Sequence, residues 1–414
     1  MLINEFSAKI IIVGSGPAGS ATALALNSLA PELARETIVL EKATHPRVKL
    51  CGGGITPYAD EVLADLGVRL NIPGFPVDVV RFTAHGVSSE IRIRNLLRIV
   101  RREEFDAALA AEVRARGVDL HEGEPVTAIE RVEDGVRLTT PAGTYRAQVV
   151  VAADGATSMV RQKLVSTVGA SRISRLIEVL TPEPDAAALP GFRDAMAVFD
   201  YSPVTQGVQG YYWDFPSIKA GQPTMNRGLF DSRVVTAAPR APLRQIFAEA
   251  LRARGRRLEA YELQGHPERW FHPDNPFSAP HVLLVGEAAG VEPLAGEGIS
   301  AALDYGLVAA PAIVAAFDRG DFSFNDYRRR VLTSRVGFQL LWKSRAARVI
   351  YRLRHPFIWK TGIRFVALVL TVLVRLADRP EPPGSIRLQE YTDDRNHPPT
   401  GYRGSRSGHS AGSL

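Results

Sequence analysis

Two short apolar runs near the start of the chain are separated by a longer alanine-rich stretch. The runs, KIIIV at 9–13 and TIVLE at 37–41, have apolar centres that are rich in β-branched side chains. This composition is typical of strands that are buried on both faces of a parallel sheet. The stretch at 18–29 has the length and the composition of a helix. Strand, helix and strand in this order predict a βαβ unit.

Similar apolar segments recur further along the chain. They predict two more buried strands, at 146–153 and 281–285, and two more helices, at 104–116 and 296–317. Residues 80–94 and 172–270 instead show short alternating segments between turns, which is typical of antiparallel strands. We therefore predict an α/β fold, α+β overall, in which a mainly antiparallel β-sheet domain is inserted into a Rossmann-type domain.

A basic and apolar segment follows the last predicted helix. Between Arg328 and Ala377 there are twelve Arg or Lys residues and no Asp or Glu, so the net charge of +6 is concentrated here. Pro356 is expected to divide the segment into two helices. The longest apolar run, 365–374, is about half of the roughly 20 residues that a spanning helix needs. We expect a helical segment that lies in a membrane surface, with Arg345, Arg348, Arg352, Lys360 and Arg364 meeting anionic headgroups.

Two other readings of this segment stay open. Its charges are also compatible with an ordinary solvated helical face, in which the apolar side chains pack against the rest of the protein. A nucleic-acid surface would give the same excess of charge, but no helix-turn-helix or zinc signature accompanies it, so we expect no nucleic-acid partner.

The overall composition is that of a globular protein. The 414 residues are enough for two or three structural units, and 45% of them are hydrophobic. A single cysteine excludes an internal disulfide, and the N-terminus has no signal-peptide pattern, so we expect a cytoplasmic protein. Residues 379–414 are rich in Pro, Gly, Ser, Asp and Arg, which predicts a disordered tail.

The first chemical motif follows the first predicted strand. Gly14, Gly16 and Gly19 form the pattern Gly-x-Gly-x-x-Gly at the start of the helix, and Glu41 ends the second strand. Such glycines permit a tight turn, the approach of a pyrophosphate to the backbone, and close packing of helix on strand. The carboxylate can accept hydrogen bonds from a ribose. Together these features predict a dinucleotide site.

Two later stretches resemble the second and third flavin motifs of the p-hydroxybenzoate hydroxylase fold. They are VVVAADGATSMVR at 149–161 and VLLVGEAAGVEPLAGEGISAAL at 282–303. The resemblance implies that the cofactor is FAD. It places the following residues on the flavin: Arg102, Asp154, Gly155, Ser158, Arg161, Glu287 and Gly298. Glu287 stands where that family usually has Asp, and its extra methylene lengthens the reach to the ribityl chain.

Two further segments resemble one branch of this fold, the geranylgeranyl reductases and related prenyl reductases. They are PRVKLCGGG at 46–54 and YYWDFP at 211–216, and the resemblance covers roughly residues 8–320. It implies that Cys51 lies at the reacting face of the flavin, and that Gly52 and Gly53 let the ring and a long chain approach the backbone. Tyr211, Trp213 and Phe215 alternate along one strand and would line the path of the substrate. The glycine pair that usually follows is missing, and only Gly228 is nearby.

The resemblance implies a reductase that saturates carbon–carbon double bonds of an isoprenoid chain. Cys51, Tyr211 or an ordered water would supply the proton, NAD(P)H or ferredoxin would reduce the FAD, and no metal is required. We expect an FAD-binding domain at 1–79, 95–171 and 271–327, and a substrate-binding domain at 80–94 and 172–270. A membrane-contact segment follows at 328–378, and a tail at 379–414. The expected location is the cytoplasmic membrane surface, without a spanning helix.

Three alternatives remain at this stage. A hydroxylase of the same fold would use oxygen and an aromatic substrate. A flavin-dependent halogenase has a segment similar to 211–216, but it needs a catalytic lysine, for which Lys49 is the nearby candidate. The chain could also be a noncatalytic membrane adaptor that works through its basic segment. Under any of these functions, Cys51 could instead be a small buried residue, and the aromatic residues simple core packing.

Overall fold

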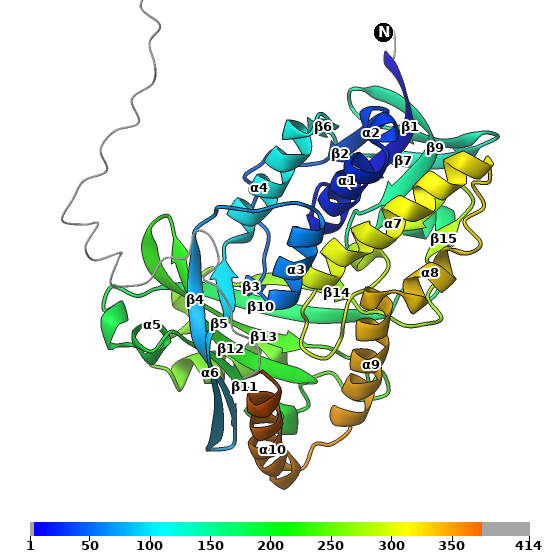
Figure 1. Cartoon of the computed structure of the whole chain (residues 1–414). Helices are drawn as coiled ribbons and strands as arrows, with labels where there is room; N and C mark the ends of the chain where they lie inside the picture. The colour runs from blue at the N-terminus through cyan, green and yellow to red at the C-terminus, as the bar shows by residue number, and fades with distance from the viewer. Residues whose placement is uncertain (1–3, 375–414) are drawn as a thin grey trace, which may run out of the picture.

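The structure, a computed structural model, describes residues 4–374, so the expected tail at 379–414 lies outside the described residues. The predicted parallel strands form the centre of its first sheet. The strands of this sheet are β1 (Asn4–Val13), β2 (Thr37–Glu41), β6 (Asp119–Glu122), β7 (Ala128–Val132), β8 (Gly135–Thr139), β9 (Gly143–Ala152), β15 (Ser278–Ala279) and β16 (Val282–Leu284). They follow the order β15-β16-β9-β1-β2-β6, and β8 joins β9 and carries β7 (Figure 1). Parallel pairing links β1 to β2 and β9, as the apolar runs predict.

Helices pack along this first sheet and extend away from it. The helices of the chain are α1 (Pro17–Leu29), α2 (Pro31–Arg35), α3 (Pro57–Asp65), α4 (Arg102–Ala115), α5 (Pro190–Arg193), α6 (Leu243–Arg252), α7 (Ile299–Arg319), α8 (Tyr327–Thr333), α9 (Arg335–Ile350) and α10 (Pro356–Val374). Single turns of other helix types lie at Arg161–Val165, Ala186–Ala188, Ser202–Gln206, Leu258–Ala260 and Gly286–Ala288. Helix α1 lies between α4 and α7 and contacts both of them (Figure 1). This arrangement completes the Rossmann-type domain.

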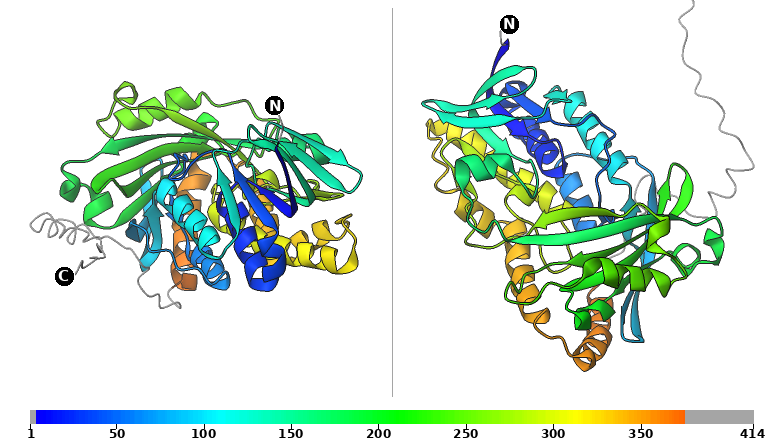
Figure 2. Two further views of the ribbon diagram at one scale, coloured as in Figure 1. Left: turned by 90° about the horizontal axis from the view of Figure 1, so that it is seen from above. Right: turned by 180° about the vertical axis from the view of Figure 1, so that it is seen from behind.

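The second sheet is mainly antiparallel, as predicted. Its strands are β3 (Gly54–Ile55), β4 (Gly74–Ala84), β5 (Val87–Val100), β10 (Ile173–Pro182), β11 (Met196–Asp200), β12 (Gly210–Lys219), β13 (Gln222–Asp231) and β14 (Gln264–Arg269). Their order is β14-β10-β13-β12-β11-β4-β5-β3. One pair, β4 with β11, is parallel. Figure 2 shows the two sheets side by side, with the helices of the first domain below them in the left view.

Each face of the second sheet has its own apolar cluster. On one face, Tyr212 packs with Phe247 and Leu251 of α6, which covers that side. On the other face, Tyr211, Trp213 and Phe215 form a separate cluster. The alternation along β12 therefore places the three aromatic residues of the motif on one side of the sheet, as the sequence predicts.

The second sheet contains more of the chain than we expected. The boundaries expected at 79/80 and 94/95 fall inside β4 and β5, which form one long hairpin. The alternation is clear only near the tip of this hairpin, where one side is exposed. Nearer the first domain, residues such as Phe75, Val77 and Ile99 are buried. Their apolar sequence therefore does not show whether the strand belongs to the first or to the second sheet.

The basic segment forms three helices rather than the two expected. Pro356 is the first residue of α10, where its missing N–H is tolerated, so the predicted break is present. A second break lies at Ser334, whose side chain accepts a hydrogen bond from the Gly337 N–H and caps α9. This cap separates α8 from α9.

Helix α7 is long and apolar enough to span a membrane, but 72% of its most apolar stretch is buried inside the protein. It packs against α1, and Gly306 lets the two helices approach, because a Cβ there would lie 2.6 Å from the Ala21 carbonyl carbon. We therefore interpret α7 as a core helix.

Candidate active site

The glycine turn between β1 and α1 has two structural glycines and one that faces open space. Gly14 has a φ of +102°, and a Cβ there would lie 2.5 Å from the Ala153 carbonyl oxygen. A Cβ at Gly19 would lie 1.9 Å from the Gly14 carbonyl oxygen. At Gly16 the one described neighbour within 4 Å is the Arg47 guanidinium, at 3.6 Å. The packing of the chain therefore requires Gly14 and Gly19, whereas Gly16 leaves its space free for a ligand.

Glu41 lies at the end of β2, directly beside this turn. One carboxylate oxygen accepts hydrogen bonds from the N–H and the hydroxyl of Ser15, at 2.9 and 3.0 Å. The other accepts from the Ala43 N–H at 3.1 Å and lies 3.5 Å from Arg47 Nε. Glu41 thus holds the glycine turn in place. Its contact with a ribose stays a prediction.

Asp154 and Gly155 follow β9 at the same edge of the sheet. A Cβ at Gly14 would lie 3.4 Å from Asp154 Cα, which places the first and second motifs together. One Asp154 oxygen accepts a hydrogen bond from the Val160 N–H, and the other has no partner among the described residues. Burial raises the pKa of this carboxyl. Ser158 accepts a hydrogen bond from the Arg161 N–H and so shapes the loop rather than pointing outward.

Glu287, in the third motif, lies in a cluster with Lys49 and His266. Lys49 Nζ donates to His266 Nε2 at 2.6 Å and lies 4.0 Å from the Glu287 carboxylate. Burial alone would raise the pKa of Glu287, but Lys49 and His266 outweigh it and lower this pKa to about 2. Glu287 Oε2 is left without a hydrogen-bond partner in the described part of the chain, and a Cβ at Gly155 would lie 3.9 Å from it.

Cys51 and its glycines pack directly on the aromatic face of the second sheet. The Asn226 side chain joins them: its amide donates to the Cys51 carbonyl oxygen at 3.0 Å, and its oxygen accepts from Trp213 Nε1 at 2.9 Å. A Cβ at Gly52 would lie 3.1 Å from the Phe215 ring. Gly53 has a φ of +78°, and a Cβ there would lie 2.1 Å from the Val100 carbonyl oxygen. Side chains at these two positions would therefore push the loop off the sheet.

Arg102 connects the Cys51 loop with the glycine turn. It is buried at the start of α4, and its guanidinium makes two hydrogen bonds to Asp106, at 2.8 and 3.0 Å. Arg47 Nη2 lies 3.2 Å from the same carboxylate. Burial raises the pKa of the Cys51 thiol, and the nearby Arg102 opposes this effect. The thiol is therefore protonated at neutral pH.

Gly228 explains how the large Trp213 ring fits. Gly228 pairs with Trp213 on one side and with Glu178 on the other, so the three residues form one row across the sheet. A Cβ at Gly228 would lie 2.1 Å from the Trp213 ring. The indole therefore occupies the space that a side chain at position 228 would take.

Glu292 organises the loop that leads into α7. Its buried carboxylate accepts hydrogen bonds from the N–H groups of Leu294, Ala295 and Glu297. Tyr211 donates its hydroxyl to the Ala295 carbonyl oxygen, and burial raises its pKa well above the usual value. Both observations make Tyr211 a weak proton donor.

Gly298 is the residue before α7, and a Cβ there would lie 3.3 Å from Glu268 Oε1.

The motif residues from distant parts of the chain thus lie in one region. Those that the sequence analysis missed are Asn226, Glu178, His266, Glu268 and Glu292. A charged or amide residue inside an apolar strand, as in LIEVL at 176–180, is the signal that could have identified Glu178 and Asn226.

The residues present fit a bound FAD. Gly16 offers an open approach to the backbone at the start of α1, where a helix N-terminus favours a pyrophosphate. One buried polar atom each of Arg47, Asp154 and Glu287 makes no hydrogen bond among the described residues, and such atoms usually make one. Arg47 Nε and Glu287 Oε2 have only ion-pair neighbours at 3.5 Å, in Glu41 and His266. A polar ligand along this edge would supply those partners.

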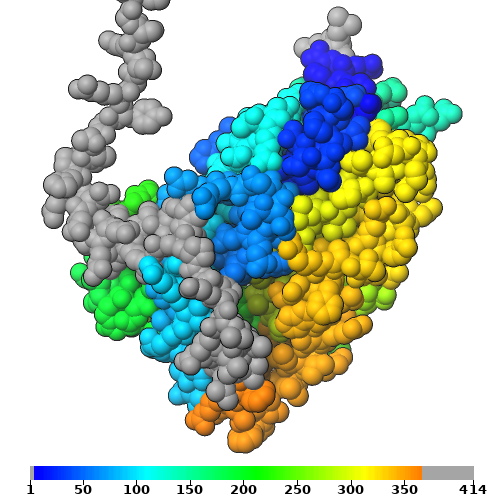
Figure 3. All heavy atoms as spheres, viewed as in Figure 1, coloured from blue at the N-terminus to red at the C-terminus, as the bar shows by residue number. Residues whose placement is uncertain are grey.

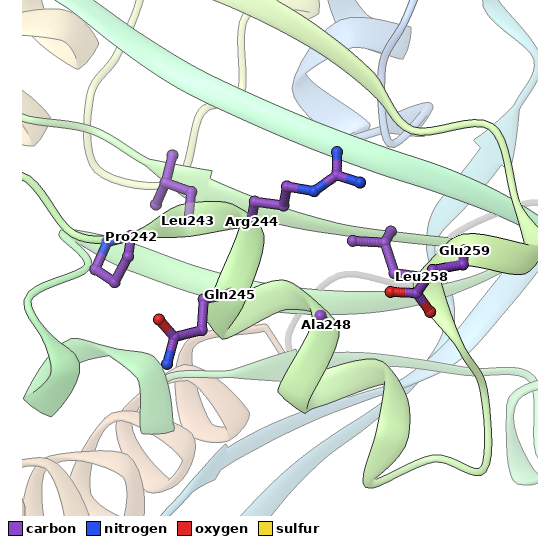
Figure 4. Close-up of a pocket in the computed structure, with 7 residues that line it drawn as sticks. All are labelled: Pro242, Leu243, Arg244, Gln245, Ala248, Leu258 and Glu259. Carbon is purple, nitrogen blue, oxygen red and sulfur yellow. The ribbon is translucent and has the colours of Figure 1, made fainter.

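A hollow elsewhere on the second domain does not belong to this site. It has a volume of 470 Å³ and opens at the surface beside α6, lined by residues such as Leu243, Gln245 and Leu258 (Figure 4). Helix α6 covers the face of the second sheet that is opposite to Tyr211, Trp213 and Phe215. The hollow is therefore separated from Cys51 by the sheet.

Comparison with known proteins supports this description. A family described as "FAD binding domain" matches residues 7–270. A menaquinone reductase of Mycolicibacterium smegmatis is 28% identical, over 73% of this chain and 75% of its own length. A digeranylgeranylglycerophospholipid reductase of Methanopyrus kandleri is 26% identical, over 77% of this chain and 80% of its own length.

Solved structures share the fold. A geranylgeranyl bacteriochlorophyll reductase-like protein of Thermoplasma acidophilum superposes with a TM-score of 0.72, at 19% identity, over 95% of this chain and 99% of its own. A probable FAD-dependent monooxygenase of Pseudomonas aeruginosa has a TM-score of 0.60 at 16% identity, over 86% and 99%. Together with the family match and the named relatives, these structures confirm the predicted fold and the resemblance to the geranylgeranyl reductases. The chain belongs to the FAD binding domain family and is an FAD-dependent oxidoreductase.

Proposed function

We propose that the protein saturates carbon–carbon double bonds in the isoprenoid chain of a membrane lipid or quinone. Reduced FAD supplies the hydride for such a reaction, and the protein has to align the alkene, exclude water and supply a proton. The names of the relatives in Methanopyrus and Mycolicibacterium support a prenyl substrate. NAD(P)H or ferredoxin would reduce the flavin.

A continuous row of aromatic rings carries this proposal. It starts at Phe215, beside Gly52, and passes through Phe199, Tyr211 and Tyr201 to Trp359 on α10. The successive ring centroids are 5.0, 5.0, 5.5 and 5.0 Å apart. The row is largely buried, and apolar side chains over this length suit a long hydrocarbon chain, whereas an aromatic substrate with a polar group would find few partners along them.

The surroundings of Lys49 favour the reductase over a halogenase. A halogenase needs a lysine that is available to its reactive intermediate. Here Lys49 donates to His266 and lies beside the Glu287 carboxylate. These contacts give Lys49 the role of holding the third motif in place.

An anaerobic experiment separates the reductase from the hydroxylase. The protein, with its FAD reduced by dithionite, is mixed with geranylgeranylated glycerophospholipid in detergent without oxygen. We expect the lipid to reoxidise the flavin, seen as the return of its visible absorbance. A hydroxylase would stay reduced until oxygen is admitted, so that result would overturn the proposal.

We further propose that α9 and α10 dock on the cytoplasmic membrane surface as a monotopic anchor. Helix α9 packs on the body of the protein through Val336, Leu340 and Ala347. At helical spacing on its other side it exposes Phe338, Trp342, Arg345 and Val349, and Arg352 is exposed just after the helix ends. Helix α10 buries Trp359 and Ile363 and exposes Phe357, Arg364 and Phe365. Both helices lie at the surface (Figure 3).

Charge and position support a lipid as the partner of this face. Apolar rings beside arginines, without any acidic residue from 328 to 377, match an anionic bilayer surface. Trp359 stacks on Tyr201, so the face continues into the aromatic row. A prenyl lipid could therefore move from the bilayer to Cys51 along apolar side chains. The burial of one side of each helix agrees in part with the alternative that this segment packs on the protein.

Co-sedimentation with liposomes tests the membrane proposal. Binding is expected to increase with the fraction of anionic lipid and to weaken in high salt, because arginines contribute to it. The double variant Phe338→Glu/Phe357→Glu should lose most of the binding, since both rings are exposed, by 68% and 69%. Leu29→Glu, a matched control at an exposed apolar position on α1, should bind like the parent. Equal binding by the double variant would contradict the proposal.

A further inference from the structure

Glu178 is a buried carboxylic acid that the site described above leaves without a role. It lies on β10 in the row that contains Gly228 and Trp213, and its side chain is 2% exposed. Its polar neighbours are the Asn226 side chain and the backbone N–H of Cys51. Among the residues that the structure describes, its Oε2 has no hydrogen-bond partner.

Among the described residues, no charged side chain forms an ion pair with Glu178. The positive charge of Arg101 acts on it, but the Arg101 guanidinium makes hydrogen bonds to both oxygens of Glu103, at 3.2 and 3.3 Å. Burial raises the pKa of Glu178, and Arg101, Asn226 and the Cys51 N–H oppose this only in part, so its pKa is about 7. The carboxyl can therefore exchange a proton near neutral pH.

We propose that Glu178 is the proton reservoir of Cys51 and returns a proton to the thiol after each reduction. This assignment rests on the proposed function. In the step, reduced FAD is the reductant and provides the hydride that forms one new C–H bond. The Cys51 S–H bond breaks and its proton forms the second C–H bond as the double bond is lost. The thiolate then takes the proton of the Glu178 carboxyl, and the carboxylate recovers a proton from solvent.

The acidities make this direction favourable. Burial raises the pKa of the Cys51 thiol above its usual value, and the charge of Glu178 raises it further. A thiolate at this position is therefore a stronger base than the Glu178 carboxylate. Tyr211, the other expected donor, has its hydroxyl bound to Ala295.

The reactivity of Cys51 tests the coupling without any substrate. Cys51 is the one cysteine of the 414 residues, so iodoacetamide reports on this thiol alone in the full-length flavoprotein. In the parent, the logarithm of the alkylation rate should rise with pH and show a flatter region near pH 7. The reason is that ionised Glu178 disfavours the thiolate. A straight profile through this region would overturn the proposal.

Glu178→Gln should remove the flatter region and make alkylation above pH 7 faster, by up to about tenfold for a thiol pKa that is lowered by about one unit. Glu259→Gln is the control for loss of one carboxyl, because Glu259 is exposed beside the hollow on the opposite side of the second sheet. It should keep the parent profile. Glu178→Asp, which retains a carboxyl, should restore the flatter region.

The same variants separate this proposal from the proposed function. In the parent, reduction of the prenyl lipid should slow as pH rises through about 7, because the protonated carboxyl is the active form. Glu178→Gln should be slow throughout and lack this transition. An unchanged rate and transition in Glu178→Gln would overturn the reservoir and leave the reductase intact. A shifted alkylation profile with no lipid reduction by the parent would support the coupling and refute the proposed reductase.

Discussion

Gly16→Val is expected to give a folded protein that contains no FAD. Apart from its neighbours in the chain, a Cβ at position 16 would meet only the Arg47 guanidinium of the described residues within 4 Å, so we expect the fold to tolerate valine there. It fills the space through which a pyrophosphate would approach the N-terminus of α1. The parent should be yellow and release its flavin on denaturation, because no covalent attachment is expected. Visible absorbance gives the flavin content, and circular dichroism confirms the fold.

Two further variants make this result specific. Gly362→Val, another glycine with open space around it, should keep the full flavin content. Gly19→Ala should fail to fold, because its Cβ would lie 1.9 Å from the Gly14 carbonyl oxygen. A Gly16→Val protein that holds as much FAD as the parent would show that the turn does not contact the cofactor.

Cys51→Ser is expected to keep its FAD and to lose alkene reduction by a factor on the order of 100, within the range that a positioned acid contributes. A hydroxyl is a much weaker acid than a thiol but is no larger, and the Asn226 hydrogen bond goes to the Cys51 backbone, which the variant keeps. Reduction of the flavin by its donor should change little, because that step does not need the substrate proton. Stopped-flow measurement of the two half-reactions separates these rates.

Cys51→Ala provides the second arm of this test. It removes the proton as well as the sulfur, so its alkene reduction should be at least as slow as that of the serine variant. Turnover equal to the parent in both variants would reduce Cys51 to a packing residue. Loss of flavin in both would instead mean that the loop at 51–53 serves to hold the cofactor.

Periodicity and motif order predicted most of the fold, because they reflect local requirements. TIVLE forms β2 from Thr37 to Glu41, as predicted, since a strand buried on both faces needs a continuous apolar run. The extent of the second sheet was underestimated, because Phe75 and Ile99 are buried and show no alternation. The cap at Ser334 was missed, although serine favours the start of a helix, because no proline marks the break between 327 and 350.

The site was predicted in part. The motifs identified Cys51, Glu287 and Trp213, each of which is marked by an unusual sequence around it. The partners of these residues could not be predicted, because they come from distant strands. Asn226 and His266 join the site only when β13 and β14 pair with β12 and β10. Such contacts depend on the register between strands, which a single sequence does not determine.

The central claim is that the chain reduces isolated double bonds of a prenyl lipid, and the mass of the product tests it most directly. The full-length protein is incubated with geranylgeranylated glycerophospholipid and a reductant for FAD, and the lipid is analysed by mass spectrometry. The account predicts a gain of two hydrogen atoms for every bond reduced, and no such gain with Gly16→Val. A gain of one oxygen atom, or an unchanged lipid, would contradict it.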